Sequence, residues 1–173
     1  MADLIFPPAI PAGVAVIACG NPTRGDDGVG GEVLRRLATA GWGTDPARVK
    51  LLDAGTDGVA VMFAARGCRR LIVIDASRSG SEPGAVFEIP GSALQEAPAR
   101  ALATHDFRWE DAIAAGRAIF REEFPRDVTV FLVEAQSLDF GIGLTLVVEA
   151  AAGKVAARIA ALLGAEPLLG VAA

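Results

Sequence analysis

Two adjacent aspartates, Asp26 and Asp27, lie in a glycine-rich stretch that reads GNPTRGDDGVGG over residues 20–31. Its first glycines have the spacing of a phosphate-binding loop, but the two aspartates replace the lysine and the serine or threonine that such a loop needs. Two carboxylates repel a phosphate, and glycines let the backbone come close to a ligand. The loop is therefore predicted to bind a cation. The residues expected to shape its backbone are Gly20, Asn21, Gly25 and Gly28.

A simpler interpretation of the same loop is that one aspartate only caps the helix that follows. Aspartate is favoured at the N-terminus of a helix because its oxygen accepts a backbone hydrogen bond and its charge suits the helix dipole. This explains one of the two carboxylates well and the second poorly. Both interpretations are open at the level of the sequence.

Two further acids follow apolar segments that are predicted to be strands. Asp53 ends the segment 49–53, and Asp75 comes directly after Leu71–Ile72–Val73–Ile74. In an open α/β sheet, ligands bind beyond the carboxyl ends of the strands, so Asp27, Asp53 and Asp75 are expected at one edge. Asp53 alone is typical of a turn. Burying the charge of Asp75 is costly, so a cation or a hydrogen-bond donor is expected beside it.

The chain has a single histidine, His105. A lone histidine is more often a surface or capping residue than a ligand. Together with Asp27 and Asp75, however, it completes a set of two oxygens and one nitrogen that suits Ni²⁺, Zn²⁺ or Fe²⁺. Three protein ligands leave coordination positions open for water or a substrate. Asp106 or a backbone carbonyl is expected to accept the second N–H of the imidazole.

A cysteine nucleophile paired with His105 is the alternative chemistry. Cys68, however, precedes the predicted strand 70–75 and is therefore expected at its amino end, away from the crevice. Cys19 is predicted to belong to the core. With two cysteines and no C-x-x-C motif, the sequence excludes a disulfide framework and fits a reducing cytoplasm.

The elements that would position these residues alternate between strand and helix. Strands are predicted over 14–19, 49–53, 70–75, 84–89 and 128–133, with 84–89 antiparallel because it follows its predecessor too closely for a helical crossover. One helix is predicted from residue 29 to about 40, and another over 109–120. A helix capped by Asp57 is expected to turn Val59, Met62 and Phe63 inward. The last helix is predicted from the stripe of Val148, Val155, Ile159 and Leu162. The pattern predicts an α/β fold: one three-layer domain with a twisted, mostly parallel five-stranded sheet, one antiparallel strand and helices on both faces.

Composition narrows the classes of partner. The 173 residues carry a formal net charge of −5 without a run of basic residues, which argues against nucleic acid as a partner. No apolar run reaches the roughly 20 residues of a membrane span, and the N-terminus lacks a basic signal sequence. We expect a cytoplasmic monomer with a loosely ordered lead-in over 1–13, a single domain over 14–165 and a C-terminal tail over 166–173.

Taken in order, these motifs resemble the nickel–iron hydrogenase maturation endopeptidases. The hallmark G-N-…-D-[DE]-G-x-G corresponds to residues 20–30, and the similarity continues through Leu52–Asp53–Ala54–Gly55–Thr56, Ile74–Asp75–Ala76, His105 and Gly141–Ile142–Gly143–Leu144–Thr145. One departure follows the histidine, where many relatives have a small or apolar stretch with glycine and this chain has Asp106–Phe107–Arg108–Trp109.

The resemblance implies an endopeptidase that removes a C-terminal extension from the precursor of the hydrogenase large subunit after nickel has been inserted. It implies that Asp27, Asp75 and His105 sense the nickel carried by the precursor and that no nucleotide is needed. The sequence leaves the activation of water open, since the metal as Lewis acid and a base such as Asp27 or Asp53 are both possible. Two alternatives are a stand-alone metallohydrolase with its own divalent metal and a non-catalytic nickel-binding chaperone.

Overall fold

The computed structural model describes residues 12–94 and 107–165. Five strands form one sheet in the order β2-β1-β3-β5-β4. Their bounds are β1 Ala12–Ala18, β2 Val49–Asp53, β3 Cys68–Ser77, β4 Val86–Pro90 and β5 Asp127–Glu134. All neighbouring pairs are parallel except β4 with β5. This is the predicted fold class, including the antiparallel strand.

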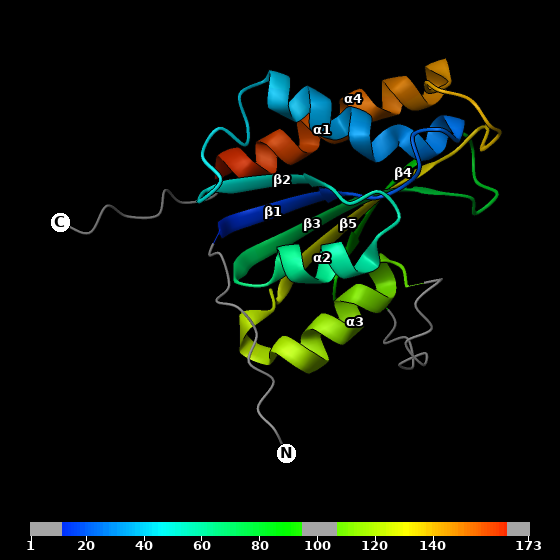
Figure 1. Cartoon of the computed structure of the whole chain (residues 1–173). Coiled ribbons are helices and arrows are strands. Elements are labelled where there is room, and N and C mark those ends of the chain that lie inside the picture. The colour runs from blue at the N-terminus through cyan, green and yellow to red at the C-terminus, as the bar shows by residue number, and fades with distance from the viewer. Residues whose placement is uncertain (1–11, 95–106, 166–173) are drawn as a thin grey trace.

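The central strands are hydrophobic because helices cover both faces of the sheet. Every residue of β1 is buried, and so is the run from Leu71 to Asp75 in β3. Helices α1 Val29–Thr39 and α4 Leu146–Ala165 pack on one face, while α2 Gly58–Ala65 and α3 Trp109–Phe120 pack on the other (Figure 1). Short 3-10 turns at Gly25–Gly28 and Arg121–Glu123 precede α1 and follow α3. None of the described helices is both long and apolar enough to cross a membrane.

The predicted inward face of α2 is confirmed for Met62 but is wrong for Val59 and Phe63. Val59 and Phe63 are 47% and 42% exposed, and the buried residues are Gly58, Val61, Met62 and Ala65. This helix is apolar all round, so its sequence carries no readable period. Its orientation is set instead by Gly58, where a Cβ atom would lie 2.3 Å from the carbonyl oxygen of Phe107. The predicted Asp57 cap is confirmed, since its Oδ1 accepts from Ala60 N at 3.0 Å.

The last helix differs from its prediction by one position. Val148, Val155 and Ile159 are buried as expected, but the next core residue is Leu163, and Leu162 is only partly buried. The step from Ile159 to Leu163 is the four-residue spacing that keeps a side chain on one face of a helix.

The order of the strands creates a crevice between β1 and β3. From β1 the chain crosses over to β2 on one side, and it then returns past β1 to build β3, β5 and β4 on the other side. The chain that leaves β1 leads through α1 to β2 at one edge of the sheet, whereas the chain that leaves β3 leads to β4 at the other edge, and ligands bind at such a switch point. Ala18 and Ile74 are paired across it, which brings the residues after β1 level with Asp75.

Candidate active site

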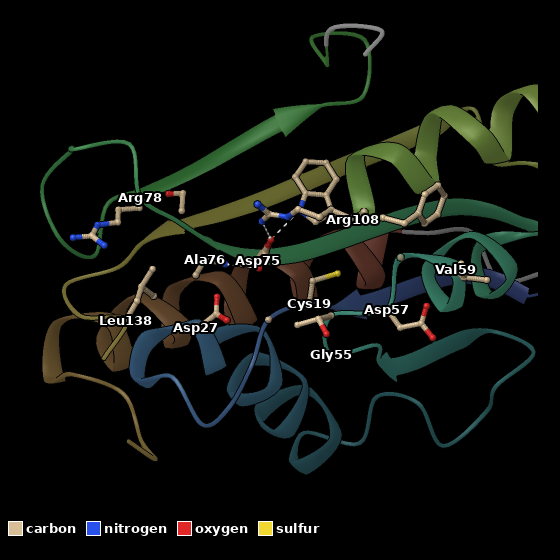
Figure 2. A pocket seen from close by; sticks show the side chains of 16 residues that line it. Cys19, Asp27, Gly55, Asp57, Val59, Asp75, Ala76, Arg78, Arg108 and Leu138 are labelled. Atoms are coloured by element: carbon tan, nitrogen blue, oxygen red, sulfur yellow. Dashed lines mark hydrogen bonds and ion pairs between the residues drawn. The ribbon is translucent and has the colours of Figure 1, made fainter. Parts of the chain in front are cut away.

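A pocket of about 700 Å³ opens at this switch point. Its walls come from the loop after β1, the turn between β2 and α2, the end of β3 and the start of α3 (Figure 2). Both Asp27 and Asp75 line it, as do Cys19 and Arg108. The structure thus brings together two of the predicted site residues from segments far apart in the chain.

Asp27 sits at the mouth of the pocket in a tightly closed turn. Its Oδ2 accepts a hydrogen bond from the backbone N of Asn21 at 2.7 Å. Gly20 adopts a φ of +116°, and a Cβ there would lie 2.0 Å from the carbonyl oxygen of Asp27, so only glycine fits. The glycine-rich loop therefore folds back on itself and fixes the aspartate.

Asp75 is a buried carboxylate with donors on two sides, as its sequence context predicted. Only 3% of the residue is exposed, and its Oδ2 accepts from Trp109 Nε1 at 2.9 Å and from Arg108 Nη2 at 3.3 Å. Burial raises the pKa of Asp75 to about 6 even though the bond from Trp109 and the charge of Arg108 lower it. The negative charge of Asp27 raises it further. A cation placed between the two carboxylates would reduce both the cost of burying the charge of Asp75 and the repulsion between Asp75 and Asp27.

Asp26 has a different role from its neighbour. It is fully buried, and its carboxylate accepts from Gln136 N, Ser137 N and both the N and Oγ1 of Thr145, at 2.7 to 3.0 Å. In the part of the chain that the structure describes, no side chain caps α1. The capping interpretation is therefore wrong for both aspartates: Asp26 ties the loop after β1 to the loop after β5, which leaves Asp27 facing the pocket.

Asp53 lies at the end of β2 as predicted, but it is exposed and is not among the residues that line the pocket. Its Oδ1 accepts from Gly55 N at 3.0 Å, and Gly55 O in turn accepts from Gly20 N at 2.9 Å. This is the turn role expected of an aspartate that closes a strand. The geometry favours Asp27 over Asp53 as a group that acts directly in the pocket.

The two cysteines are unsuited to nucleophilic chemistry. Cys68 begins β3 at the amino end of the sheet, as predicted, and Cys19 belongs to the core as well as to the pocket floor. Burial raises the pKa of both thiols, and the nearby charge of Asp75 adds to the effect at Cys19. A buried thiol that resists ionisation is a poor nucleophile.

His105, the third predicted ligand, and its neighbour Asp106 lie outside the described residues. The described chain resumes at Phe107, which lines the pocket, and the backbone N of Gly58 donates to its carbonyl oxygen at 3.2 Å. Within residues 12–94 and 107–165, no three His, Cys, Asp or Glu side chains lie close enough together to hold a metal ion.

Sequence reasoning missed the contribution of Phe107, Arg108 and Trp109 to the pocket wall. Trp109 was predicted only as a core residue of α3, which it also is, with 5% of its surface exposed. The available signal was the departure from the family pattern after His105, because that departure begins the segment that contacts Asp75. A buried indole N–H needs an acceptor, and Asp75 supplies it.

Comparison with known proteins agrees with this geometry. The family model described as "HycI: Hydrogenase maturation protease" matches residues 33–162. The chain belongs to the hydrogenase maturation protease family. The hydrogenase 2 maturation protease of Escherichia coli K12 is 28% identical over 138 residues, which are 79% of this chain and 82% of that protein.

Other curated relatives match over shorter lengths. The putative hydrogenase maturation protease MJ0253 of Methanocaldococcus jannaschii is 32% identical over 78 residues, or 44% of this chain and 49% of that protein. HupD of Rhodobacter capsulatus, a hydrogenase expression/formation protein, is 30% identical over 108 residues, or 62% of this chain and 50% of its own length. This chain thus spans about half the length of these two relatives.

Solved structures of the family share the fold. The hydrogenase maturating endopeptidase HybD of E. coli superposes with a TM-score of 0.71 at 25% identity, covering 88% of this chain and 92% of that chain. HybD of Thermococcus kodakarensis gives a TM-score of 0.69 at 24% identity, covering 87% of this chain and 99% of its own. The predicted resemblance and fold class are confirmed, and membership of this protease family supports the predicted peptidase class.

Proposed function

We propose that this protein is an endopeptidase that removes the C-terminal extension from the precursor of a nickel–iron hydrogenase large subunit. The nickel already inserted in the precursor serves as the recognition element, and it is held by Asp27, Asp75 and His105. The main support for this proposal is that Asp27 and Asp75 face one pocket at the switch point of the sheet. The chain enters that pocket at Phe107, two residues after His105.

The charge pattern of the pocket supports a substrate that brings its own cation. Asp27 and Asp75 repel each other, as the effect of Asp27 on the pKa of Asp75 shows, and Asp75 is buried. A divalent ion on the substrate would replace the partial compensation that Arg108 provides at 3.3 Å. Binding is therefore coupled to the presence of the metal, and a precursor without nickel gains nothing from the two carboxylates.

Hydrolysis then requires a water molecule next to the scissile peptide bond. The water oxygen adds to the carbonyl carbon, the C–N bond breaks, and the new amine leaves with a proton. Asp27 is the better-placed base because it is partly exposed in the pocket, whereas Asp53 points into its own turn. Polarisation of the carbonyl by the nickel of the substrate is the second contribution.

Mass spectrometry of a nickel-loaded precursor before and after incubation tests this function directly. The expected result is the loss of a C-terminal peptide, with no loss from a nickel-free precursor. Cleavage of both precursors would instead indicate a stand-alone metallohydrolase. Nickel transfer without a change in mass would indicate a chaperone, and either result contradicts the proposal.

Matched variants assign the residues. We expect Asp75→Asn and His105→Ala to abolish processing while the far-ultraviolet circular dichroism spectrum stays that of the folded protein. Asp53→Asn is the control, because this acid ends the neighbouring strand without lining the pocket. Full processing by Asp75→Asn or by His105→Ala would refute the nickel-binding assignment.

The setting of this activity is also a proposal. Both cysteines are free and buried, which suits a reducing cytoplasm, and we propose a monomeric enzyme in that compartment.

A further inference from the structure

The loop between β5 and α4, together with the first residue of α4, exposes large apolar side chains next to the pocket. Phe140, Ile142 and Leu146 are 83%, 91% and 85% exposed, far more than the other large hydrophobic residues that reach the surface in the described part of the chain. We call these three residues the apolar rim. Single exposed hydrophobic residues are normal, but several that lie close together in one short segment indicate a site of interaction.

The apolar rim is held in place rather than loosely attached. Gly25 N donates to Gly141 O at 2.9 Å, and Gly141 N donates to Thr23 O at 2.9 Å, so the loop pairs with the segment after β1. The buried carboxylate of Asp26 binds both ends of the same loop, at Gln136 and at Thr145. A surface that is already ordered loses little conformational entropy on binding.

The position of the rim connects it to the active site. Leu138 of the same loop lines the pocket, and Figure 2 shows Leu138 and Arg78 at one end of it, with Asp57 and Val59 at the other. Figure 1 shows the loop, in yellow and orange, beside the start of α1 at the carboxyl ends of the strands. A protein whose terminal segment enters the pocket from this end must lie over the rim.

Two guanidinium groups border this surface. Arg24 stacks over the ring of Phe140, with its Cζ 4.8 Å from the ring centroid. Arg24 and Arg78 are exposed, and neither forms an ion pair with a carboxylate in the described part of the chain. The exposed carboxylate of Asp139 lies next to Phe140 in the same loop, so the border of the rim carries charges of both signs. Arg24 and Arg78 therefore suit a partner with an apolar patch that has carboxylates opposite these two guanidinium groups.

We propose that the apolar rim, with Arg24 and Arg78 at its edge, docks the folded body of the large-subunit precursor while the C-terminal extension occupies the pocket. The inference rests on the proposed function and deepens it, because it separates recognition of the precursor surface from recognition of the nickel. The docked patch is apolar with acidic borders. Affinity for the precursor therefore has a part that does not depend on Asp27 or Asp75.

The test is single-turnover processing of the nickel-loaded precursor by the double variant Ile142→Ser/Leu146→Ser across a range of enzyme concentrations. We expect the concentration that gives half the maximal rate to rise at least ~10-fold, because buried apolar anchors dominate such interfaces. The maximal rate should stay within about twofold, since the pocket is untouched. Ile119→Ser is the matched control: it removes an exposed isoleucine, 42% accessible, from the end of α3.

The possible outcomes distinguish failure of the docking surface from failure of the proposed endopeptidase function. A wild-type protein that leaves the precursor intact overturns the proposed function and this inference with it. A wild-type protein that cleaves, with an unchanged half-maximal concentration in the double variant, overturns the docking surface alone. A wild-type dimer that the variant converts to monomer assigns the rim to self-association and also overturns it. A lower melting temperature of the variant would mean that the rim packs against this chain itself, and this result would also overturn the docking surface.

Discussion

The indole of Trp109 donates a hydrogen bond to the buried carboxylate of Asp75, from Nε1 to Oδ2 at 2.9 Å. This bond joins the first residue of α3 to the central strand β3, so the helix begins at the pocket wall. A carboxylate in a hydrophobic strand is costly to bury without such a donor. The pair therefore keeps a negative charge available at a position where the sheet alone would disfavour it.

The first prediction concerns the stability cost of Asp75. Its folded-state pKa of about 6 exceeds the ordinary 3.8, so the native state binds more protons than the unfolded state between these values. Wild-type stability should therefore fall as pH rises from about 4 to about 6 and then level off. Asp75→Asn removes this dependence, so the stability of wild type relative to Asp75→Asn should fall by up to roughly 3 kcal/mol between pH 4 and pH 7.5.

Urea denaturation of both proteins at pH 4 and pH 7.5 measures this difference. At pH 4 the wild-type carboxyl is largely protonated in the native state, so the free-energy difference between the two proteins at this pH is the reference for the difference at pH 7.5. An equal free-energy difference between the two proteins at both pH values would show that ionisation of Asp75 costs no stability.

The second prediction concerns Trp109→Phe, which keeps a buried ring but removes the indole donor. The bond from Trp109 lowers the pKa of Asp75, so its loss should raise that pKa. If ionised Asp75 grips the nickel, kcat/KM for the precursor declines on the acid side near the pKa of this group. We expect the acid limb of the kcat/KM profile to move to higher pH in Trp109→Phe.

The chain offers a matched control for this substitution in its second tryptophan. Trp42 packs against the core on the α1–α4 face of the sheet, with Arg48 over its ring. Trp42→Phe should leave the acid limb where it is in wild type. Equal profiles for all three proteins would mean that Trp109 only packs and does not tune Asp75.

The third prediction separates the two adjacent aspartates. Asp26 is buried and accepts from several donors of the loop after β5. The carboxylate of Asp27 is partly exposed and, among the described residues, accepts only from Asn21 N. Asp26→Asn places an amide group against backbone N–H groups, which should destabilise the protein by ~1–3 kcal/mol or more. Asp27→Asn should cost little stability but should lower the processing rate at least 100-fold.

Urea denaturation and precursor processing, measured on both variants, give a two-by-two comparison. The expected pattern is a large stability loss for Asp26→Asn and a large activity loss at normal stability for Asp27→Asn. The reverse pattern would show that the functional carboxylate of this loop is Asp26.

The sequence predicted the sheet well because its signals are local. Apolar runs bounded by glycine or aspartate mark buried strands, and the short interval before β4 allows only an antiparallel partner. The orientation of α2 was beyond the sequence, because a helix that is apolar all round has no polar face to mark its exposed side. The orientation of α2 depends on the packing of Gly58 against Phe107, a contact between distant parts of the chain.

The same limit applies to the site. Strand ends placed Asp27 and Asp75 at one edge, because parallel strands bring their carboxyl ends together. Asp26 is buried and Asp27 faces the pocket because the loop after β5, more than a hundred residues further along the chain, binds the carboxylate of Asp26. Likewise, the partners of Asp75 come from α3, whose start no local pattern linked to β3.

The last prediction concerns Glu134, a buried carboxylate that holds the loop carrying Arg78. It accepts from Ser79 N and Gly80 N and from the hydroxyls of Ser77 and Ser79. These bonds, above all the one from Ser79 N, lower the pKa of Glu134 to about 2.

A group whose pKa is lower in the folded than in the unfolded state stabilises the protein above its unfolded-state pKa. This contribution is lost as the pH falls through the folded-state pKa. Wild type should therefore lose stability between about pH 4.5 and pH 2. Glu134→Gln should lose less over this range while starting from lower stability at pH 7. Thermal unfolding across these pH values measures the effect, with Glu82→Gln, an exposed glutamate of the same loop, as the control. Parallel stability curves for wild type and Glu134→Gln would show that this carboxylate does not anchor the loop.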